Sequence, residues 1–498
     1  MKTYMAQTVL IILVASTGPI NICMARTHFS SLSGRALGAP SSISGSNIVY
    51  AAHAKPSEQK PNFQVKFSEP FAVFNFVTSI SSKFPDNPLK KLFSNSKFNE
   101  EKYKALIAAY ERLNIDYSYQ YTEYPYGHKE AGSTAALLRR NLINSRTIND
   151  FRLSSFGVIP NANLLKLSSI LAEFEPVYQE LVYQPNKERF EAQLAELKNQ
   201  IASKDIASYF STGIRFYNSS WDNSVPFNFV FYPLPNSRGY MATVFSNNAV
   251  SAIPTDLTDY NGLLSVMLHE IFHVLMDEQP LAFKKDLDRW FVSNPSRNSR
   301  YAFILAQEAL ATSLGNGYVL GKLNGKEIDG NWYNRKYVNL MAKKIYPMVK
   351  DYAEKQQSID QAFVDNYIKI FDDNFSSWLS EADFLMTVRY ALSDNSENFQ
   401  VIDQKFPYRS EQTYVGHITK SSLEKMSEVP ITKVVIVSKD NKTKLQLIKQ
   451  GFAELKDWKP DAKTDFTHSV FLKDKTYLIV INSVRKTTEE QLETLKLK

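Results

Sequence analysis

One helical segment of this 498-residue chain constrains its fold more than any other feature. Between Gly262 and Met276 nearly every residue is apolar, which predicts a helix surrounded by other elements. His269, Glu270 and His273 interrupt this run within the sequence His-Glu-Ile-Phe-His. Burying such polar groups is costly unless each one has a partner. We therefore expect a core that supplies partners for these three side chains.

The composition narrows the class of protein. Hydrophobic residues make up 44% and charged residues 22%, so neither a disordered chain nor a polytopic membrane protein is expected. At roughly 150 residues per domain, the length predicts two to four domains. The 58 Lys and Arg exceed the 51 Asp and Glu by only 7, which is less than a nucleic-acid binder of this size would carry. We expect no nucleic-acid partner.

The N-terminus has the pattern of an export signal. Lys2 is followed by the apolar segment Thr8–Ala15, which is too short to span a bilayer as a helix. The small residues Cys23 and Ala25 have the spacing of a signal-peptidase site. These features predict a signal peptide over residues 1–25 and no transmembrane span in the mature form.

Removal of that signal would also remove Cys23, the only cysteine. The mature chain would begin at Arg26 and contain no disulfide and no thiol ligand for a metal. Export without disulfides favours a bacterial periplasmic or secreted protein. Lipidation of Cys23 is the alternative, although the bulky Ile22 before it argues against this.

We predict an α+β fold that is mainly helical, with a β-hairpin or sheet before the Gly262–Met276 helix and a small C-terminal α/β domain. Apolar residues at helical spacing predict further helices over Asn99–Leu113, Leu164–Leu181, Lys187–Ile201, Ser299–Leu314, Tyr337–Lys355 and Ile359–Phe371. The predicted divisions are a flexible leader over 26–64, a mainly helical N-terminal region over 65–224, a core domain over 225–429 and an α/β domain over 430–498.

A period of two replaces the helical period between Val225 and Pro254. Phe227, Phe229 and Phe231 alternate with other residues, and Pro235–Gly239 has the composition of a turn. A second extended segment follows over 240–253. This pattern predicts a β-hairpin whose two strands are neighbours.

The C-terminal segment has its own pattern of strands and helices. Strands are predicted over Thr432–Val437, Thr467–Leu472 and Tyr477–Asn482, with helices over Lys442–Leu455 and Thr488–Leu497. From residue 430 onward there are 14 Lys and Arg against 9 Asp and Glu, so 14 minus 9 leaves a local surplus of 5. This domain could make weak contact with an anionic surface, or its charges could simply form a solvated face.

The spacing of the two histidines indicates a metal-binding site. Residues four apart lie on one face of a helix, so both imidazoles of His269 and His273 can bind one metal ion, with Glu270 beside it. Zn²⁺ is the expected cofactor because it accepts imidazole and carboxylate ligands and leaves a position for water. Glu270 is the expected general base. The alternative is that all three residues are hydrogen-bonded inside a core.

A third ligand must come from another part of the chain, since no histidine follows within about sixty residues. Glu308 lies in the predicted helix Ser299–Leu314, and an antiparallel packing of the two helices would bring it to the metal. Asp277 is the competitor, one turn beyond His273 on the same helix. Its position close to Pro280 indicates an exposed helix end, which favours Glu308.

With these residues in place, the region from about 225 to 320 resembles the gluzincin zinc metallopeptidases. In that superfamily HExxH lies on one helix and a glutamate ligand on a following helix, so the resemblance implies a zincin-like core in which His269, His273 and Glu308 bind zinc. It also implies an edge strand that binds extended peptide, often with an Asn-Ala pair. Asn248 and Ala249 would then bind substrate, unless this segment is only a turn or bulge.

Two positions depart from the pattern of that superfamily. Many gluzincins have an acidic residue four positions after the glutamate ligand, whereas Thr312 and Ser313 stand there in this chain. The residue that would stabilise the oxyanion is not apparent. Tyr318, Tyr337 and Tyr390 are candidates, and each could equally be a packing residue.

The sequence therefore predicts an exported zinc-dependent metallopeptidase that hydrolyses peptides or proteins. Two alternatives share the predicted metal site. One is a non-catalytic metal-containing protein that binds cell-wall or protein partners, and the other is an amidase that acts on cell-wall peptides. The presence of Glu270 favours catalysis, because a purely structural zinc site does not need a carboxylate beside an open coordination position.

Overall fold

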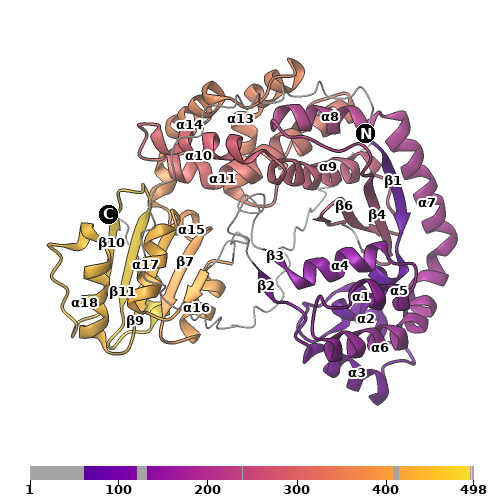
Figure 1. The fold of residues 1–498 in the computed structure, drawn as a ribbon, viewed down its shortest axis with the longest axis horizontal. Helices are drawn as coiled ribbons and strands as arrows, with labels where there is room; N and C mark the ends of the chain where they lie inside the picture. Colours follow the sequence, from indigo (N-terminus) through magenta and orange to yellow (C-terminus); the bar gives the residue numbers. More distant parts are fainter. Residues whose placement is uncertain (1–60, 120–131, 238, 408–413, 494, 496–498) are drawn as a thin grey trace, which may run out of the picture.

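The computed structural model of the protein describes residues 61–119, 132–237, 239–407, 414–493 and 495. The predicted signal peptide over 1–25 and nearly all of the predicted leader lie outside the described residues. The fold is α+β, as predicted, with sheets of mixed strand direction. Its parts follow an arc from an N-terminal helical lobe, through a central layer of helices, to a C-terminal lobe (Figure 1).

A four-stranded sheet with the order β1-β4-β6-β5 joins the N-terminal lobe to the central helices. Its strands are β1 (Phe63–Phe67), β4 (Phe227–Leu234), β5 (Ala242–Phe245) and β6 (Asn248–Pro254). Strands β1, β4 and β6 are parallel, and β5 runs antiparallel to β6. The predicted boundary at residue 225 therefore divides a single sheet, because β1 pairs with a strand more than 150 residues later in the chain.

The predicted hairpin across Pro235–Gly239 is wrong in its pairing. Strand β4 does not pair with β5, because β6 lies between them. The hairpin turn is instead Ser246-Asn247, between β5 and β6, where Ser246 has a φ of 57°. Alternating apolar residues identify strands but not their neighbours, which explains the error.

Both faces of this sheet are covered. Phe227, Phe229 and Phe231 of β4 face the central helices, whereas Val230 and Val250 face the N-terminal lobe. All seven residues of β6 are buried, as is typical of a central strand with helices on both sides. The sheet is thus a shared wall between two hydrophobic cores.

The N-terminal lobe and its connection to the central helices are helical, as predicted from 65 to 224. A short pair of strands, β2 (Ser118–Tyr119) and β3 (Gly132–Ser133), accompanies the helices. The helices are α1 (Glu69–Ile80), α2 (Pro88–Ser94), α3 (Glu101–Glu111), α4 (Thr134–Asn144), α5 (Ile148–Ser154), α6 (Asn161–Tyr178), the π-helix η2 (Gln179–Tyr183), α7 (Gln184–Ser203) and α8 (Ile206–Phe216).

The central layer contains the predicted helix Gly262–Met276, which is confirmed as α9 (Tyr260–Asp277). The three other helices predicted for this region are also present, as α11 (Ser299–Ala311) with the π-helix η3 (Thr312–Val319), α13 (Lys336–Glu354) and α14 (Gln361–Phe375). Four helices of this region were not predicted, namely α10 (Leu281–Ser293), α12 (Leu320–Asn324), the 3₁₀ helix η4 (Ser376–Ser380) and α15 (Ala382–Leu385). Within the described residues, no helix combines the length and the apolar character needed to cross a membrane.

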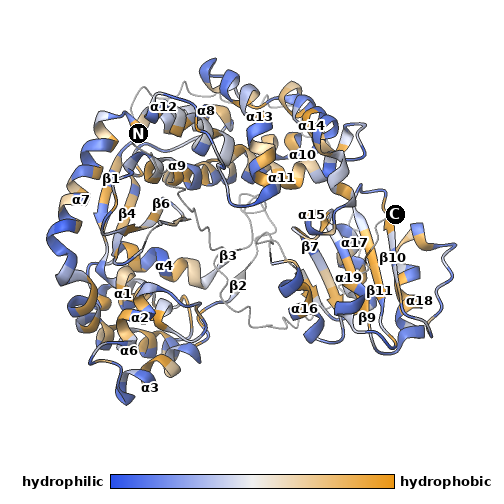
Figure 2. Ribbon diagram, turned by 180° about the vertical axis from the view of Figure 1, so that it is seen from behind, coloured by the Kyte–Doolittle hydropathy of each residue, from blue (hydrophilic) through white to orange (hydrophobic). Residues whose placement is uncertain are grey.

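The C-terminal lobe has a five-stranded sheet with the order β10-β11-β9-β7-β8. Its strands are β7 (Arg389–Ser393), β8 (Tyr414–Gly416), β9 (Thr432–Val437), β10 (Phe466–Phe471) and β11 (Tyr477–Asn482). The predicted boundary at residue 430 cuts through this sheet, because β7 and β8 precede it. The apolar strands lie among the helices α16 (Glu397–Lys405), α17 (Lys420–Glu428), α18 (Asn441–Gly451) and α19 (Thr488–Glu493), with the short 3₁₀ helix η5 (Ala453–Leu455) after α18 (Figure 2).

The C-terminal lobe is joined to the central helices by a continuous core. Val434, Ile436, Ile479 and Ile481 belong to the same hydrophobic cluster as α9 and α11. The Tyr301 hydroxyl also meets the Thr432 hydroxyl at 3.0 Å and accepts a hydrogen bond from the backbone of the neighbouring strand β11. The C-terminal lobe therefore supports helix α11 directly.

Candidate metal site

Helix α9 starts at a side-chain cap and remains buried along its length. The carboxylate of Asp259 accepts a hydrogen bond from the backbone of Gly262 at 2.9 Å, which satisfies one free N–H of the first turn. A side chain at Gly262 would lie 2.2 Å from the hydroxyl of Tyr240, so only glycine fits there. The first turn of α9 is therefore packed tightly against Tyr240.

The second helix of the site is α11, which continues as the π-helix η3. Gly315 in η3 lies against α9 so closely that an added Cβ would be 3.0 Å from the Cα of His269. A π-helix is rare, and it is often found at functional sites. Close packing through Gly315 allows the side chain of Glu308, at the end of α11, to reach the face of α9 that carries the histidines.

The two histidines and Glu308 converge on one point. The Nε2 atoms of His269 and His273 are 3.1 Å apart, and each lies 3.7 Å from one carboxylate oxygen of Glu308. In a tetrahedral zinc site with bonds of 2.0–2.1 Å, ligand atoms are about 3.3 Å apart. The three side chains therefore form a cluster that could hold a metal ion. Their donor set, two imidazoles and a carboxylate, suits Zn²⁺.

The cluster is open on one side. The exposed fraction of the side chain rises from 3% at His269 through 15% at His273 to 37% at Glu308. Glu270 is half-buried next to His269. Ligands that reach solvent at one edge differ from those of a purely structural zinc site, which is closed.

The protonation states of the cluster suit a cation. Burial lowers the pKa of His273 to about 4, so this imidazole is neutral near pH 7. Burial alone would raise the pKa of Glu308, but the two imidazoles and a hydrogen bond from Tyr333 hold it well below its usual range. Burial opposes protonation of His269 too, yet the neighbouring Glu308 and Glu270 raise its pKa. A metal would displace the proton that this pair of carboxylates attracts.

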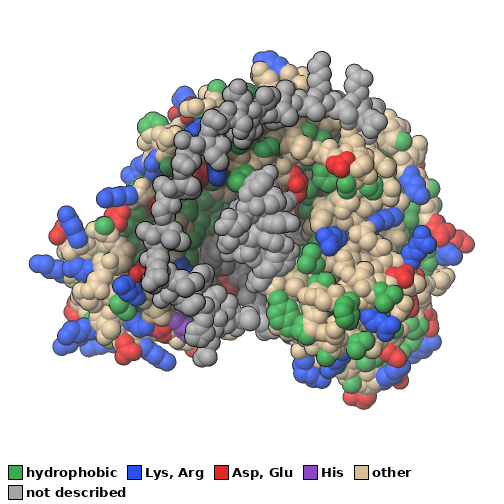
Figure 3. Space-filling model, in the orientation of Figure 1, with side chains coloured by type: hydrophobic (Ala, Val, Ile, Leu, Met, Phe, Trp, Pro, Cys, Tyr) green, Lys and Arg blue, Asp and Glu red, His purple; other side chains and the backbone are tan. Residues whose placement is uncertain are grey.

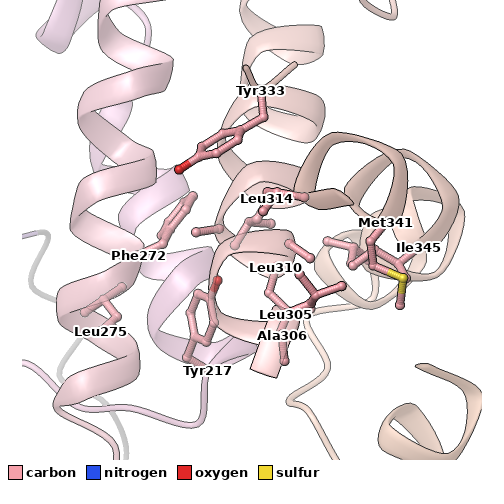
Figure 4. Close-up of a cluster of buried hydrophobic side chains, with 14 of the residues drawn as sticks. Tyr217, Phe272, Leu275, Leu305, Ala306, Leu310, Leu314, Tyr333, Met341 and Ile345 are labelled. Carbon is pink, nitrogen blue, oxygen red and sulfur yellow. The ribbon is translucent and has the colours of Figure 1, made fainter. Parts of the chain in front are cut away.

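The sequence did not single out Tyr333, yet this residue contacts the cluster directly. Its hydroxyl donates a hydrogen bond of 2.8 Å to Glu308, and its ring stacks on that of His269. Burial and the Glu308 carboxylate raise the pKa of Tyr333 far above its usual value, so the hydroxyl remains a donor. Figure 4 shows the hydroxyls of Tyr333 and Tyr217 pointing into the space between α9 and α11.

Two asparagines hold the Tyr333 segment in place. The side-chain oxygen of Asn339 accepts hydrogen bonds from the backbone N–H groups of Trp332 and Tyr333. The side chain of Asn316 in η3 donates to the carbonyl of Trp332 at 2.8 Å. Tyr333 lies in a loop with no periodic pattern, so no sequence signal could have identified it beyond the general tendency of loops to carry functional residues.

The three tyrosines considered from the sequence lie elsewhere. The ring of Tyr318, near the end of η3, contacts Lys322 of α12, and the hydroxyl of Tyr337 donates a hydrogen bond to Glu381. Tyr390 is in strand β7 of the C-terminal sheet.

Asp277, the competitor for the third ligand, is the last residue of α9 and forms an ion pair with Lys284 at 3.4 Å. The structure brings Glu308, and not Asp277, to the two histidines.

The edge position expected for Asn248 and Ala249 is not observed. Both residues are completely buried in β6, which is flanked by β4 and β5, so β6 is an inner strand and the edge strands of the sheet are β1 and β5. The side chain of Asn248 accepts a hydrogen bond from Asn228 and donates one to the carbonyl of Phe245. Its amide therefore closes the β5–β6 turn, and it has no exposed surface for a substrate.

We find no match for this chain among protein-family models, curated proteins or solved structures.

Proposed function

We propose that the protein is a zinc-dependent metallopeptidase that is exported from the cytoplasm. The convergence of the His269, His273 and Glu308 donor atoms, at separations close to those of a tetrahedral site, is the observation that supports this function. His269, His273 and Glu308 would hold the ion. When bound, zinc lowers the pKa of a coordinated water toward neutrality.

Glu270 would act as the general base. It follows a metal ligand directly in the sequence, and its charge is close enough to affect the pKa values of both His269 and Tyr333. Glu270 would take the proton of the attacking water and return it to the leaving amine when the peptide bond breaks. A half-buried carboxylate next to an open ligand set serves no purpose in a structural site, so this residue favours catalysis over the non-catalytic alternative.

Tyr333 would keep Glu308 in place. Metal ligands are commonly oriented by hydrogen bonds from outer residues, and losing such a bond weakens metal binding. The hydroxyl of Tyr333 satisfies one oxygen of Glu308, and the other oxygen faces His273. Tyr333 therefore supplies the outer hydrogen bond to Glu308. The side chains of Thr312 and Ser313, which stand where many gluzincins have an acidic residue, make no such bond.

The function is tested by elemental analysis of the purified protein and by digestion of a peptide library. We expect one equivalent of zinc and cleavage of internal or terminal peptide bonds that stops when a chelator is added and returns with zinc. Cleavage restricted to cell-wall peptides would indicate an amidase instead. Metal without hydrolysis of any peptide would support the non-catalytic alternative.

A further inference from the structure

A group of exposed apolar side chains lies in the N-terminal lobe, apart from the metal site. Phe156 is 74% exposed, Leu153 66% and Leu165 52%, and these are the three highest values among the large hydrophobic residues that the structure describes. Leu153 lies near the end of α5, Phe156 in the following turn and Leu165 in α6, and α5 packs against α6. We call Leu153, Phe156 and Leu165 the apolar tip.

The backbone is shaped to present Phe156 outward. The N–H of Val158 donates to the carbonyl of Ser155 at 3.0 Å, which closes a four-residue turn. Gly157 has a φ of 84° at the third position, as a type II turn requires. Phe156 therefore occupies the second position of a tight turn, where its ring extends away from the chain. A ring placed this way contributes nothing to the core of its own lobe.

The surroundings of the apolar tip are basic. From Arg139 to Lys166 the sequence has five Lys and Arg but a single acid, Asp150. Arg146, Arg152 and Lys166 are exposed, and within the described residues none of them forms a salt bridge. Other lysines of the same lobe do pair with acids, such as Lys97 with Glu180 and Lys102 with Glu173, each at 2.7 Å.

The combination fits a lipid surface better than a protein partner. A stable protein interface buries roughly 800 Å² on each side and needs a complementary surface of that size, whereas three projecting side chains form only a small convex patch. A bilayer accepts projecting Phe and Leu side chains at its boundary and attracts the cations around them when its headgroups are anionic. Figure 3 shows further hydrophobic side chains on the surface of this lobe, among the basic ones.

We propose that the apolar tip is a membrane-binding site, which inserts Leu153, Phe156 and Leu165 into the outer layer of an anionic bilayer while Arg146, Arg152 and Lys166 contact the lipid headgroups. In Figure 1, helices α5 and α6 lie in the lobe at one end of the arc, away from α9 and α11 in its middle part. Binding through this end leaves the metal site away from the lipid. The proposal does not depend on the catalytic function.

The test is co-sedimentation of the purified protein with phosphatidylcholine vesicles, with and without phosphatidylglycerol. We expect binding only when phosphatidylglycerol is present, and weaker binding as salt is added, because salt screens the attraction between the charges. Replacing Leu153 and Phe156 by Ser should lower the partition coefficient about tenfold or more, given the apolar area that each side chain removes from water.

Matched variants distinguish the contribution of the apolar tip from a general effect of removing exposed apolar or basic side chains. The double change Val292→Ser and Val484→Ser removes exposed apolar side chains elsewhere and should leave vesicle binding unchanged. Arg152→Gln with Lys166→Gln should weaken binding, whereas Lys439→Gln with Lys442→Gln, in the basic C-terminal lobe, should not. An unchanged unfolding midpoint would show that the Leu153 and Phe156 variant is folded.

Three results would overturn the proposal. The first is that the wild-type protein does not bind vesicles containing phosphatidylglycerol. The second is a tip variant that binds these vesicles as well as wild type does. The third is self-association, seen by light scattering without lipid and abolished by Phe156→Ser, which would assign the tip to a second copy of the chain. Hydrolysis of a soluble peptide by the tip variant should be unaffected, so the outcome is independent of the metal site.

Discussion

Lys433 of the C-terminal sheet and His269 of the central layer are both buried, but their surroundings differ. All three donor positions of the Lys433 ammonium are used, by Asp474, Thr476 and the carbonyl of Ile431. The imidazole of His269 instead faces a second imidazole and a carboxylate. The ammonium of Lys433 has all of its hydrogen-bond partners within the protein. In the His269 cluster, by contrast, two imidazole nitrogens and a carboxylate converge on one point.

The same contrast holds for the neighbours of each group. Arg389 in β7 is almost completely buried, and its guanidinium binds Asp403 and the carbonyls of Met386 and Phe406. Near the His269 cluster, the hydroxyls of Thr312 and Ser313 are buried and have no hydrogen-bond partner among the described residues. Buried polar groups are normally paired, as Lys433 and Arg389 are, and the hydroxyls of Thr312 and Ser313 next to Glu308 depart from this rule.

Among changes in these two regions, removal of the Glu308 carboxylate should have the largest effect on metal binding and stability. A carboxylate that joins two helices through a metal contributes to both zinc affinity and stability. The Glu308→Ala variant should therefore lose most of its zinc and its hydrolytic activity, and its unfolding midpoint should be lower than that of wild type. Asp277→Ala, the matched control at the end of α9, should keep its metal. Equal zinc occupancy in Glu308→Ala and wild type, measured by elemental analysis after mild chelation, would remove Glu308 from the site.

Glu270→Gln should separate catalysis from metal binding. The amide cannot accept the proton of water, and general base catalysis typically contributes 10²–10⁴ in rate, so turnover should fall at least about a hundredfold. Zinc content should stay near one equivalent because Glu270 is not among the clustered ligand atoms. Turnover would be measured on the best substrate from the peptide library. Full activity of this variant would contradict the proposed mechanism.

A change at Lys433 should affect stability alone. Lys433→Met leaves Asp474 without its buried partner, and breaking a buried ion pair costs roughly 3–5 kcal/mol, with the lower end expected because Asp474 is 28% exposed. Lys355→Met, which breaks an exposed pair with Asp351, should cost less than about 1 kcal/mol. Denaturant unfolding measures both, and zinc loss in Lys433→Met under native conditions would show that the two regions are coupled.

The smallest of these effects is expected for Tyr333→Phe. This variant keeps the ring against His269 and removes only the hydrogen bond to Glu308. Loss of an outer bond to a metal ligand typically costs 10–100-fold in affinity or activity, so we expect zinc affinity to fall about tenfold. Competition with a chromogenic chelator measures it. Tyr337→Phe, whose hydroxyl binds Glu381, is the control and should bind zinc as wild type does.

Local pattern was a reliable guide to individual elements. The predicted strands Thr432–Val437 and Tyr477–Asn482 coincide with β9 and β11, and helix α9 differs from its predicted bounds by only one or two residues at each end. These segments have a strong period or a continuous apolar run, and such patterns depend only on neighbouring residues. The spacing of His269 and His273 is local in the same sense, because four residues along any helix return to the same face.

Contacts between distant segments were less predictable. No feature of Phe63–Phe67 indicates that it pairs with β4, and nothing between Val225 and Pro254 reveals that β6 separates β4 from β5. The same holds for the C-terminal sheet, in which β7 and β8 come from before residue 430. Strand pairing depends on register and on the way whole faces pack, and a one-dimensional pattern does not contain this information.

The sequence by itself determined the buried helix, the two imidazoles on its face and the restriction of the third ligand to a few acidic residues. The tertiary structure decided which acidic residue meets them, because the close approach of η3 to α9 at Gly315 and the support of α11 by the C-terminal lobe set the position of Glu308. It also decided that Tyr333 binds this carboxylate. A helix specifies the faces of its own residues, whereas the distance between two helices depends on all the side chains packed between them.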